Sequence, residues 1–317
     1  MKYRKSFLAL LLAAALTLPA AAVVLTSAEV ENAAPVAENL TLSTFKDVAI
    51  SSRFAAVDPE GDPVTFQIVD SPARGQVTVD ETDTAAFWYT PYEGKKGKDT
   101  FTYVAVDSHG NISEPATVKI TIEKQSTRVT YSDMSGEQAH YAALRLAEEG
   151  IYVGRKMGDL YCFDPGEAFT REEFLALAMS VAGVKPLNGI TLTGFSDDDD
   201  ISAWAKGYVS AALMEGTVQG SRNSEGQVVF NGSAPISRAE AAVMIDRLLK
   251  VGDVAVETFG SDAVPAWASQ SVANMDAVAV MSVDASIFET MSRSEGAQML
   301  CAMKDVLENR KDSDWLW

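Results

Sequence analysis

The residues with the clearest chemical potential are three arginines that share one four-residue pattern. Each pattern reads Ser or Thr, Arg, any residue, Glu, and precedes an apolar run; the copies are Thr170-Arg171-Glu172-Glu173, Ser237-Arg238-Ala239-Glu240 and Ser292-Arg293-Ser294-Glu295. A hydroxyl residue with glutamate three places on is a capping box, which starts a helix. Arginine has no part in that cap, and a cation is unfavourable at the positive end of a helix dipole. We therefore expect the arginines to bind an anion, with pairing to a carboxylate of the adjacent unit as the alternative for Arg238.

The arginine patterns belong to repeated units that must position them. Each unit begins with an aromatic residue that is followed two or three residues later by aspartate: Tyr131-Ser132-Asp133, Phe195-Ser196-Asp197 and Phe259-Gly260-Ser261-Asp262. An aromatic beside alanine then begins a first helix, and the arginine pattern begins a second helix with apolar residues at i, i+3, i+4 and i+7. A two-helix unit of about 55 residues cannot bury such a stripe alone, so the three units are expected to pack together.

In order and triplication, these motifs resemble the S-layer homology repeat, here over about residues 131 to 310. The expected repeats are 131–185, 195–250 and 259–310. The resemblance implies a mostly helical, pseudo-threefold module that holds exported proteins on the cell wall of Gram-positive-type bacteria. It does so by binding secondary cell-wall polysaccharide, typically acidic and pyruvylated, in grooves between repeats.

The resemblance also implies which residues line those grooves. They are the arginines Arg171, Arg238 and Arg293, the aromatic residues Tyr141, Trp204 and Trp267, and the glycines Gly150, Gly154, Gly216 and Gly220. Helix N-terminal N–H groups would add to the anion site, and glycine would let a sugar approach the backbone. From the residues alone, Trp204 and Trp267 are instead expected in the core, because they lie at helical spacing from apolar neighbours.

The copies depart from the family pattern in two places. The first unit has Tyr141 where the family has tryptophan, and the third reads Asp276-Ala277-Val278-Ala279-Val280-Met281 where both glycines should be. We therefore expect the first two units to supply the better groove and the third mainly to close the module. The run 197–200, four aspartates, is expected to be a solvated helix entry rather than a metal site.

Residues 34–124 have a different pattern, with short alternating strands rich in Val, Thr, Phe and Tyr between turn clusters. This pattern predicts an all-β sandwich of immunoglobulin architecture and resembles the cadherin-like, Ig-like tandem domains of bacterial surface proteins. The fold class is therefore multidomain, a sandwich followed by the helical module. The resemblance implies a calcium site at Asp58, Glu60, Asp62 and Asp107, although an Asp/Gly/Pro turn without metal is favoured. No cofactor is otherwise required.

The N-terminus predicts export. Basic residues precede an apolar run and small residues, which is typical of a secretory signal over 1–28, cleaved after Ala28 or, alternatively, after Ala22. The whole chain carries a formal net charge of −18, which disfavours nucleic acid and anionic membranes as partners. Its two cysteines, Cys162 and Cys301, are expected to pack as thiols, with pairing as the alternative.

Nothing in the motifs predicts an enzyme, because no paired-histidine metal motif, nucleophile elbow or phosphate-binding loop occurs. The expected function is non-enzymatic: a protein held on the cell wall, or in the S-layer, by its helical module, with the sandwich as a spacer or adhesive unit. Secondary cell-wall polysaccharide is the expected partner, with other surface proteins as further candidates. The alternatives are a self-assembling array protein and a cell-wall glycan hydrolase component.

Overall fold

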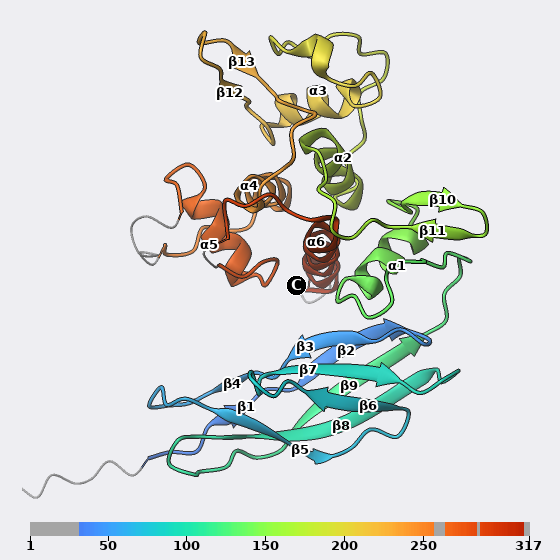
Figure 1. Cartoon of the computed structure of the whole chain (residues 1–317). Coiled ribbons are helices and arrows are strands. Elements are labelled where there is room, and N and C mark those ends of the chain that lie inside the picture. Colours follow the sequence, from blue (N-terminus) through green and yellow to red (C-terminus); the bar gives the residue numbers. More distant parts are fainter. Residues whose placement is uncertain (1–31, 257–263, 284–285, 314–317) are drawn as a thin grey trace, which may run out of the picture.

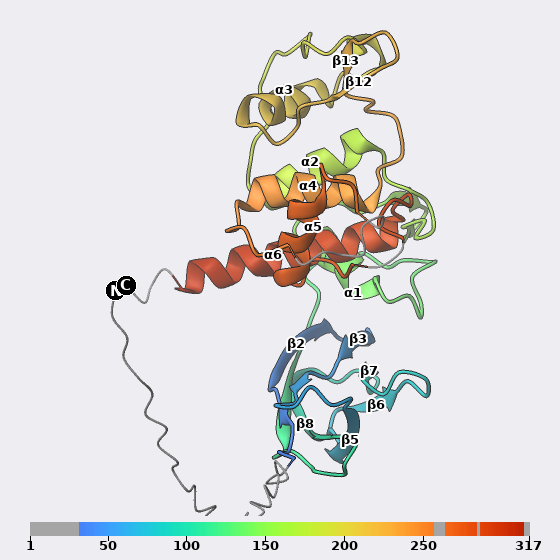
Figure 2. The same cartoon turned by 90° about the vertical axis from the view of Figure 1, so that its left-hand side faces the viewer.

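The computed structural model describes residues 32–256, 264–283 and 286–313. The predicted signal at 1–28 and the entry of the third unit at 259–262 lie outside these residues. The described chain forms a β-sandwich followed by a helical part, and the two lie side by side in both views (Figures 1 and 2).

The N-terminal part is a sandwich of two sheets, as its alternating pattern predicts. Its strands are β1 Val36–Ala37, β2 Leu40–Phe45, β3 Ile50–Arg53, β4 Ala56–Val57, β5 Thr65–Asp70, β6 Gly75–Val79, β7 Ala86–Pro91, β8 Gly97–Val106 and β9 Ala116–Glu123. One sheet has the order β2-β9-β8-β5 and the other β3-β7-β6, while β1 pairs with β4. Alternate residues of β9 are buried between the sheets, and the rings of Phe54 and Phe87 stack there with centroids 4.3 Å apart.

The helical part consists of three helix pairs. The helices are α1 His140–Glu148, α2 Arg171–Val181, α3 Lys206–Glu215, α4 Arg238–Leu249, α5 Ser269–Ala277 and α6 Arg293–Ser313. Between the helices lie the short strands β10 Arg155–Met157, β11 Leu160–Cys162, β12 Ser221–Arg222 and β13 Val228–Val229, and the 3-10 turn η1 Asp198–Asp200. The second helices, α2, α4 and α6, contact one another at the centre, and the first helices lie outside them (Figure 1).

The three pairs are linked in a closed ring. The residue that caps each second helix forms an antiparallel bridge with the segment before the next second helix: Thr170 with Pro235, Ser237 with Thr290, and Ser292 with Ala168. Because the third link returns to the first pair, the three pairs close into a ring. The apolar stripes of α2, α4 and α6 are buried within this ring, as their spacing predicts.

The sandwich is held against the first helix pair. Phe45, at the end of β2, is buried in the same core as the helices, and its ring centroid lies 5.3 Å from that of Tyr141. In the connector, residues 124–130 after β9, the N–H groups of Ser126 and Thr127 donate to the Glu148 carboxylate at 2.7 and 2.8 Å. The two hydroxyl groups donate to the same carboxylate. Glu148 therefore fixes the connector to the end of α1.

We expect Glu148→Gln to lower the melting temperature only above acidic pH. Burial disfavours the charged form, but the four donors outweigh burial and lower the pKa of Glu148 to about 2. A carboxyl whose pKa is depressed on folding contributes stability above its unfolded value of 4.5, and loses it as pH falls toward 2. The difference in melting temperature between wild type and variant should thus shrink from pH 6 to pH 2.5. A difference independent of pH would contradict this role.

Candidate functional site

The three motif arginines reach across to carboxylates of another helix pair. Arg171 Nη1 lies 2.7 Å from Glu240 Oε1, and Arg238 pairs with Glu295 Oε1. Arg293 Nη1 lies 3.5 Å from Asp164 Oδ2. The arginine side chains are only 14–21% exposed. For Arg238 this is the predicted alternative, and Arg171 and Arg293 pair with another unit in a similar way.

Two capping-box glutamates have a second role in this pairing. Glu240 accepts from the Ser237 N–H with Oε2, at 3.0 Å, and offers Oε1 to Arg171. Glu295 divides its oxygens in the same way between Ser292 and Arg238. Burial raises the pKa of Glu295, but Arg238 and the Ser292 donors outweigh it, so the pKa is lowered. The cation in the first turn is thus stabilised by the cap of the next helix.

The prediction that helix N-terminal N–H groups help to bind an anion is wrong for these helices. At α2 the first two N–H groups donate to Ala234 O and Gly232 O, at 2.9 and 3.0 Å, and the third donates to the capping hydroxyl of Thr170. At α4 the first three N–H groups donate to Glu289 O, Ile287 O and Ser237 Oγ. At α6 they donate to Glu167 O, Pro165 O and Ser292 Oγ. In the described part of the chain, the first three N–H groups of each of these helices are thus already used within the protein.

A groove of about 430 Å³ lies where the three helix pairs meet. The first pair contributes Arg171, and the third contributes Trp267. The second contributes most of the wall: Thr217, Val218, Gln219, Gly220, Ser221, Asn231, Ala234, Pro235, Glu240, Val243, Met244 and Arg247. The groove thus combines an aromatic face, amide and hydroxyl groups, and two guanidinium groups.

Both tryptophans are on the surface, so the expectation that they lie in the core is wrong. Trp267 is 58% exposed and Trp204 is 53% exposed. Each lies just before the first residue of its helix, α5 or α3, where it can project outward despite helical spacing from apolar neighbours. Trp267 lines the groove. The third unit therefore contributes directly to it, and its expected role of mainly closing the ring is too narrow.

The four predicted glycines have roles within the chain. Gly150 and Gly216 follow α1 and α3 with φ of +68° and +78°, and a Cβ on either would meet nothing within 4 Å. In the third unit Ala279 takes the same conformation, with φ of 55°. Gly154 and Gly220 are different, because a Cβ would lie 2.5 Å from Cys162 O and 2.6 Å from the Phe195 ring. Of the four, Gly220 lines the groove.

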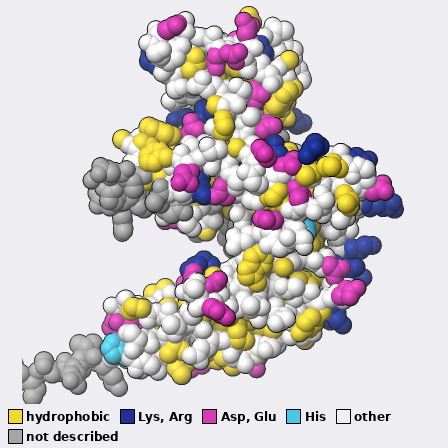
Figure 3. All heavy atoms as spheres, viewed as in Figure 1, with side chains coloured by type: hydrophobic (Ala, Val, Ile, Leu, Met, Phe, Trp, Pro, Cys, Tyr) yellow, Lys and Arg dark blue, Asp and Glu magenta, His cyan; other side chains and the backbone are white. Residues whose placement is uncertain are grey.

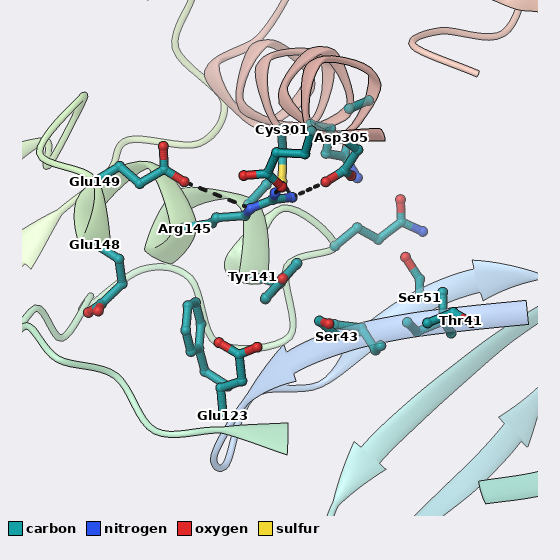
Figure 4. Close-up of a pocket in the computed structure, with 18 of the residues that line it drawn as sticks. Thr41, Ser43, Ser51, Glu123, Tyr141, Arg145, Glu148, Glu149, Cys301 and Asp305 are labelled. Carbon is teal, nitrogen blue, oxygen red and sulfur yellow. Dashed lines mark hydrogen bonds and ion pairs between the residues drawn. The ribbon is translucent and has the colours of Figure 1, made fainter. Parts of the chain in front are cut away.

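Tyr141 is not brought together with the motif arginines. It packs on Phe45 and lines a different cavity, of about 1,090 Å³, between the sandwich and α1 and α6. Figure 4 shows Arg145 in this cavity between Glu149 and Asp305. Burial lowers the pKa of Arg145, but Cys301 and the hydrogen-bonded Asp305 outweigh burial, so the pKa is raised. Cys301, a free thiol like Cys162, is buried beside Arg145, and burial raises its pKa to about 11.

The acidic run at 197–200 is only partly a solvated helix entry. Asp197 accepts from the N–H groups of Phe230 and Asn231 at 2.9 and 2.7 Å, which holds the groove residue Asn231 in place. Asp198 is buried and bonds to Lys206 and Thr193. Both bonds lower its pKa, to about 2, with Lys206 the larger cause. The prediction is wrong for these two residues, while Asp199 and Asp200 are exposed.

The predicted calcium ligands form parts of two turns. Asp58 Oδ1 accepts from the N–H groups of Glu60 and Asp62. Asp107 accepts from the N–H groups of His109 and Asn111 with Oδ1, and from the side-chain amides of Asn32 and Asn111 with Oδ2. Asp62, Asp107 and His109 lie close enough together to share an ion, but Asp107 would first have to give up amide donors. Calcium binding stays a prediction.

Sequence reasoning missed Arg247 and Asn231 as groove residues. Arg247 lies nine residues after Arg238, where the other second helices have Ser180 and Ala302. That difference between copies was the available signal. Asn231 follows β13 and faces the groove only because Asp197 holds its backbone, which no local pattern indicates.

Comparison with known families identifies two kinds of domain in the chain. Residues 32–121 match the bacterial Ig domain, and residues 194–242 match the S-layer homology domain. The chain therefore carries a bacterial Ig domain followed by an S-layer homology region, a combination that indicates a bacterial cell-surface protein. None of the helices in the described ranges is both long and apolar enough to span a membrane.

Three curated relatives match part of the chain. A surface-layer 125 kDa protein of Lysinibacillus sphaericus is 27% identical over 38% of this chain and 10% of its own length. The exoglucanase XynX of Acetivibrio thermocellus is 31% identical over 41% of this chain and 12% of its own. The amylopullulanase of Thermoanaerobacterium thermosulfurigenes is 40% identical over 41% of this chain and 7% of its own. The matched segment is thus about a tenth of each relative, and the two enzymes match in the S-layer homology region.

Proposed function

We propose that this chain is a non-enzymatic cell-surface protein whose helical part attaches it non-covalently to the cell wall. The three helix pairs act as three S-layer homology repeats, and their groove binds secondary cell-wall polysaccharide with acidic, pyruvylated sugars. The bacterial Ig domain is the spacer or adhesive unit. The observation that carries the proposal is the groove in which exposed Trp267 lies with Arg171 and Arg247.

The ring supports treating all three helix pairs as repeats of one kind. The family match covers the second pair up to the start of α4. The first and third pairs have the same kind of cap and the same bridge to the next pair. Each arginine also pairs with a carboxylate of another pair, although Arg293 uses Asp164 where the other two use a capping-box glutamate. Caps and bridges made by equivalent residues favour one repeated unit over three unrelated helix pairs.

The groove has the composition that binding an acidic sugar requires. An exposed indole offers an apolar face to a sugar ring, and the amide and hydroxyl groups around it can bond to sugar hydroxyls. Acidic side chains are spread over both parts of the molecule on the face shown in Figure 3. Because the chain as a whole is negative, an acidic ligand must be held by local cations rather than by the global field.

Co-sedimentation of the purified chain with isolated cell walls tests the proposal. Wild type should sediment with the walls, and Trp267→Ala should weaken binding by about thirtyfold, since truncating a central tryptophan typically costs about 2 kcal/mol. Tyr92→Ala is a matched control, because Tyr92 is also a half-exposed aromatic residue but lies in the sandwich. Equal losses for the two variants, or no sedimentation of wild type, would reject the proposal.

A further inference from the structure

We propose that Arg247, rather than the motif arginines, binds the carboxylate of the wall polysaccharide. This inference rests on the function proposed above and names the side chain that recognises the acidic group of the ligand. Three independent observations carry it: the motif arginines are committed within the chain, Arg247 is not, and Arg247 lies at the end of the groove away from the acid that lines it.

The motif arginine of the groove is already paired. Arg171 places Nη1 on Glu240 Oε1 at 2.7 Å, donates from Nε to Phe230 O at 3.0 Å, and lies over the Phe230 ring. Its charge is thus offset by Glu240, which lines the same groove. A ligand carboxylate placed here would meet Glu240 as well as Arg171, so attraction and repulsion would largely cancel.

Arg247 has no such commitment. Its one hydrogen bond runs from Nη1 to the carbonyl oxygen of Thr217 at 3.1 Å. Within the described ranges, no carboxylate oxygen lies within 4.0 Å of its guanidinium nitrogens. The side chain is half-buried and lines the groove with Trp267. A guanidinium in this setting keeps donors for a carboxylate, in a place where water screens the charge less than on an open surface.

The spacing along α4 separates the neutral and the positive end of the groove. Arg247 follows Glu240 by seven residues, which is about two helical turns, so both lie on one face and about 10 Å apart along the helix axis. The Arg171–Glu240 pair therefore forms a neutral end, and Arg247 forms a positive end. A sugar chain lying along α4 would place its carboxylate at Arg247.

The position is specific to the second helix pair. The corresponding residues of α2 and α6 are Ser180 and Ala302, neither of which can supply a cation. A threefold ring of similar units thus has one place of this kind. We accordingly expect one high-affinity acidic site for each chain, although three copies of the arginine pattern are present.

Isothermal titration with two forms of the polymer tests the inference. The probes are purified wall polysaccharide that carries pyruvate ketals and the same polymer after mild acid has removed them. Arg247→Ala should weaken binding of the pyruvylated form by about ten- to a hundredfold, the range for a hydrogen bond to a charged group. It should leave binding of the ketal-free form within about twofold of wild type. Arg247→Gln keeps a donor for Thr217 O and should show the same loss if the alanine variant is unstable.

Controls separate this inference from the proposed function. Arg128→Ala removes the same charge from the exposed connector, and should change both affinities by less than about twofold. If Arg247 variants keep the wild-type preference for the pyruvylated form while Trp267→Ala still loses binding, the inference falls and the proposed function stands. If wild type binds neither form, both fall.

Discussion

Gly220→Ala should lower the free energy of unfolding of the helical part by about 2–5 kcal/mol. The residue has φ of +74°, and a Cβ would lie 2.6 Å from Phe195 Cε1 and 2.7 Å from Val229 O. A left-handed backbone costs an alanine about 1–2 kcal/mol, and overpacking adds about 1–3 kcal/mol. Denaturation of the full chain, followed by helical circular dichroism, measures the change.

Gly216→Ala is the matched comparison, four residues earlier on the same loop. Its φ is +78°, but a Cβ there would meet nothing within 4 Å. We expect only the backbone cost, about 1–2 kcal/mol, and Ala279 shows that this chain tolerates alanine at the corresponding place. Equal effects of the two substitutions would show that contact with Phe195 and Val229 is not what requires Gly220.

Glu240→Ala should destabilise the helical part by about 2–4 kcal/mol, because it removes two contacts at once. The capping box of α4 loses its glutamate, worth about 1 kcal/mol. Arg171, whose side chain is 14% exposed, loses the carboxylate that offsets its charge, and a hydrogen bond to a charged group contributes about 1.5–3 kcal/mol. Urea denaturation of wild type and variant gives the difference.

A double-mutant cycle of Arg171→Ala and Glu240→Ala isolates the pairing itself. We expect a coupling free energy above about 1 kcal/mol. The exposed pair Arg53–Asp83, with side chains 64% and 45% exposed, should couple by less than about 1 kcal/mol. If Arg171 and Glu240 couple no more strongly than this exposed pair, the motif arginine does not stabilise the ring. Arg171 would then again be a candidate for binding the ligand.

The parts of the fold set by local patterns could be predicted from sequence. The capping boxes at Thr170, Ser237 and Ser292 predict where each second helix begins, because both partners of a capping box lie within four residues of sequence. Alternation in residues such as those of β9 predicts a sandwich strand for the same local reason. Pairing of Arg238 across units could be predicted as an alternative, since its charge is unfavourable at the start of its own helix.

The composition of the groove depends on contacts between distant segments, and sequence patterns did not reveal it. Trp267 is exposed and meets Arg171 and Arg247 only because three units converge. Tyr141 is expected at the aromatic position of the first unit, but it lies two residues after the N-cap of α1, whereas Trp204 and Trp267 precede the N-caps of α3 and α5. Phe45, about a hundred residues earlier, packs on Tyr141. Asp197 looked like part of a solvated acidic run, but two backbone N–H groups some thirty residues later determine its position.

The central claim is that this chain binds acidic wall polysaccharide in the groove of its helical part. Calorimetric titration of wild type with pyruvylated polymer, and then with ketal-free polymer, tests it most directly. We expect about one high-affinity site for each chain, and an affinity lower by about tenfold or more once the carboxylates are removed. Equal affinity for the two polymers would contradict it.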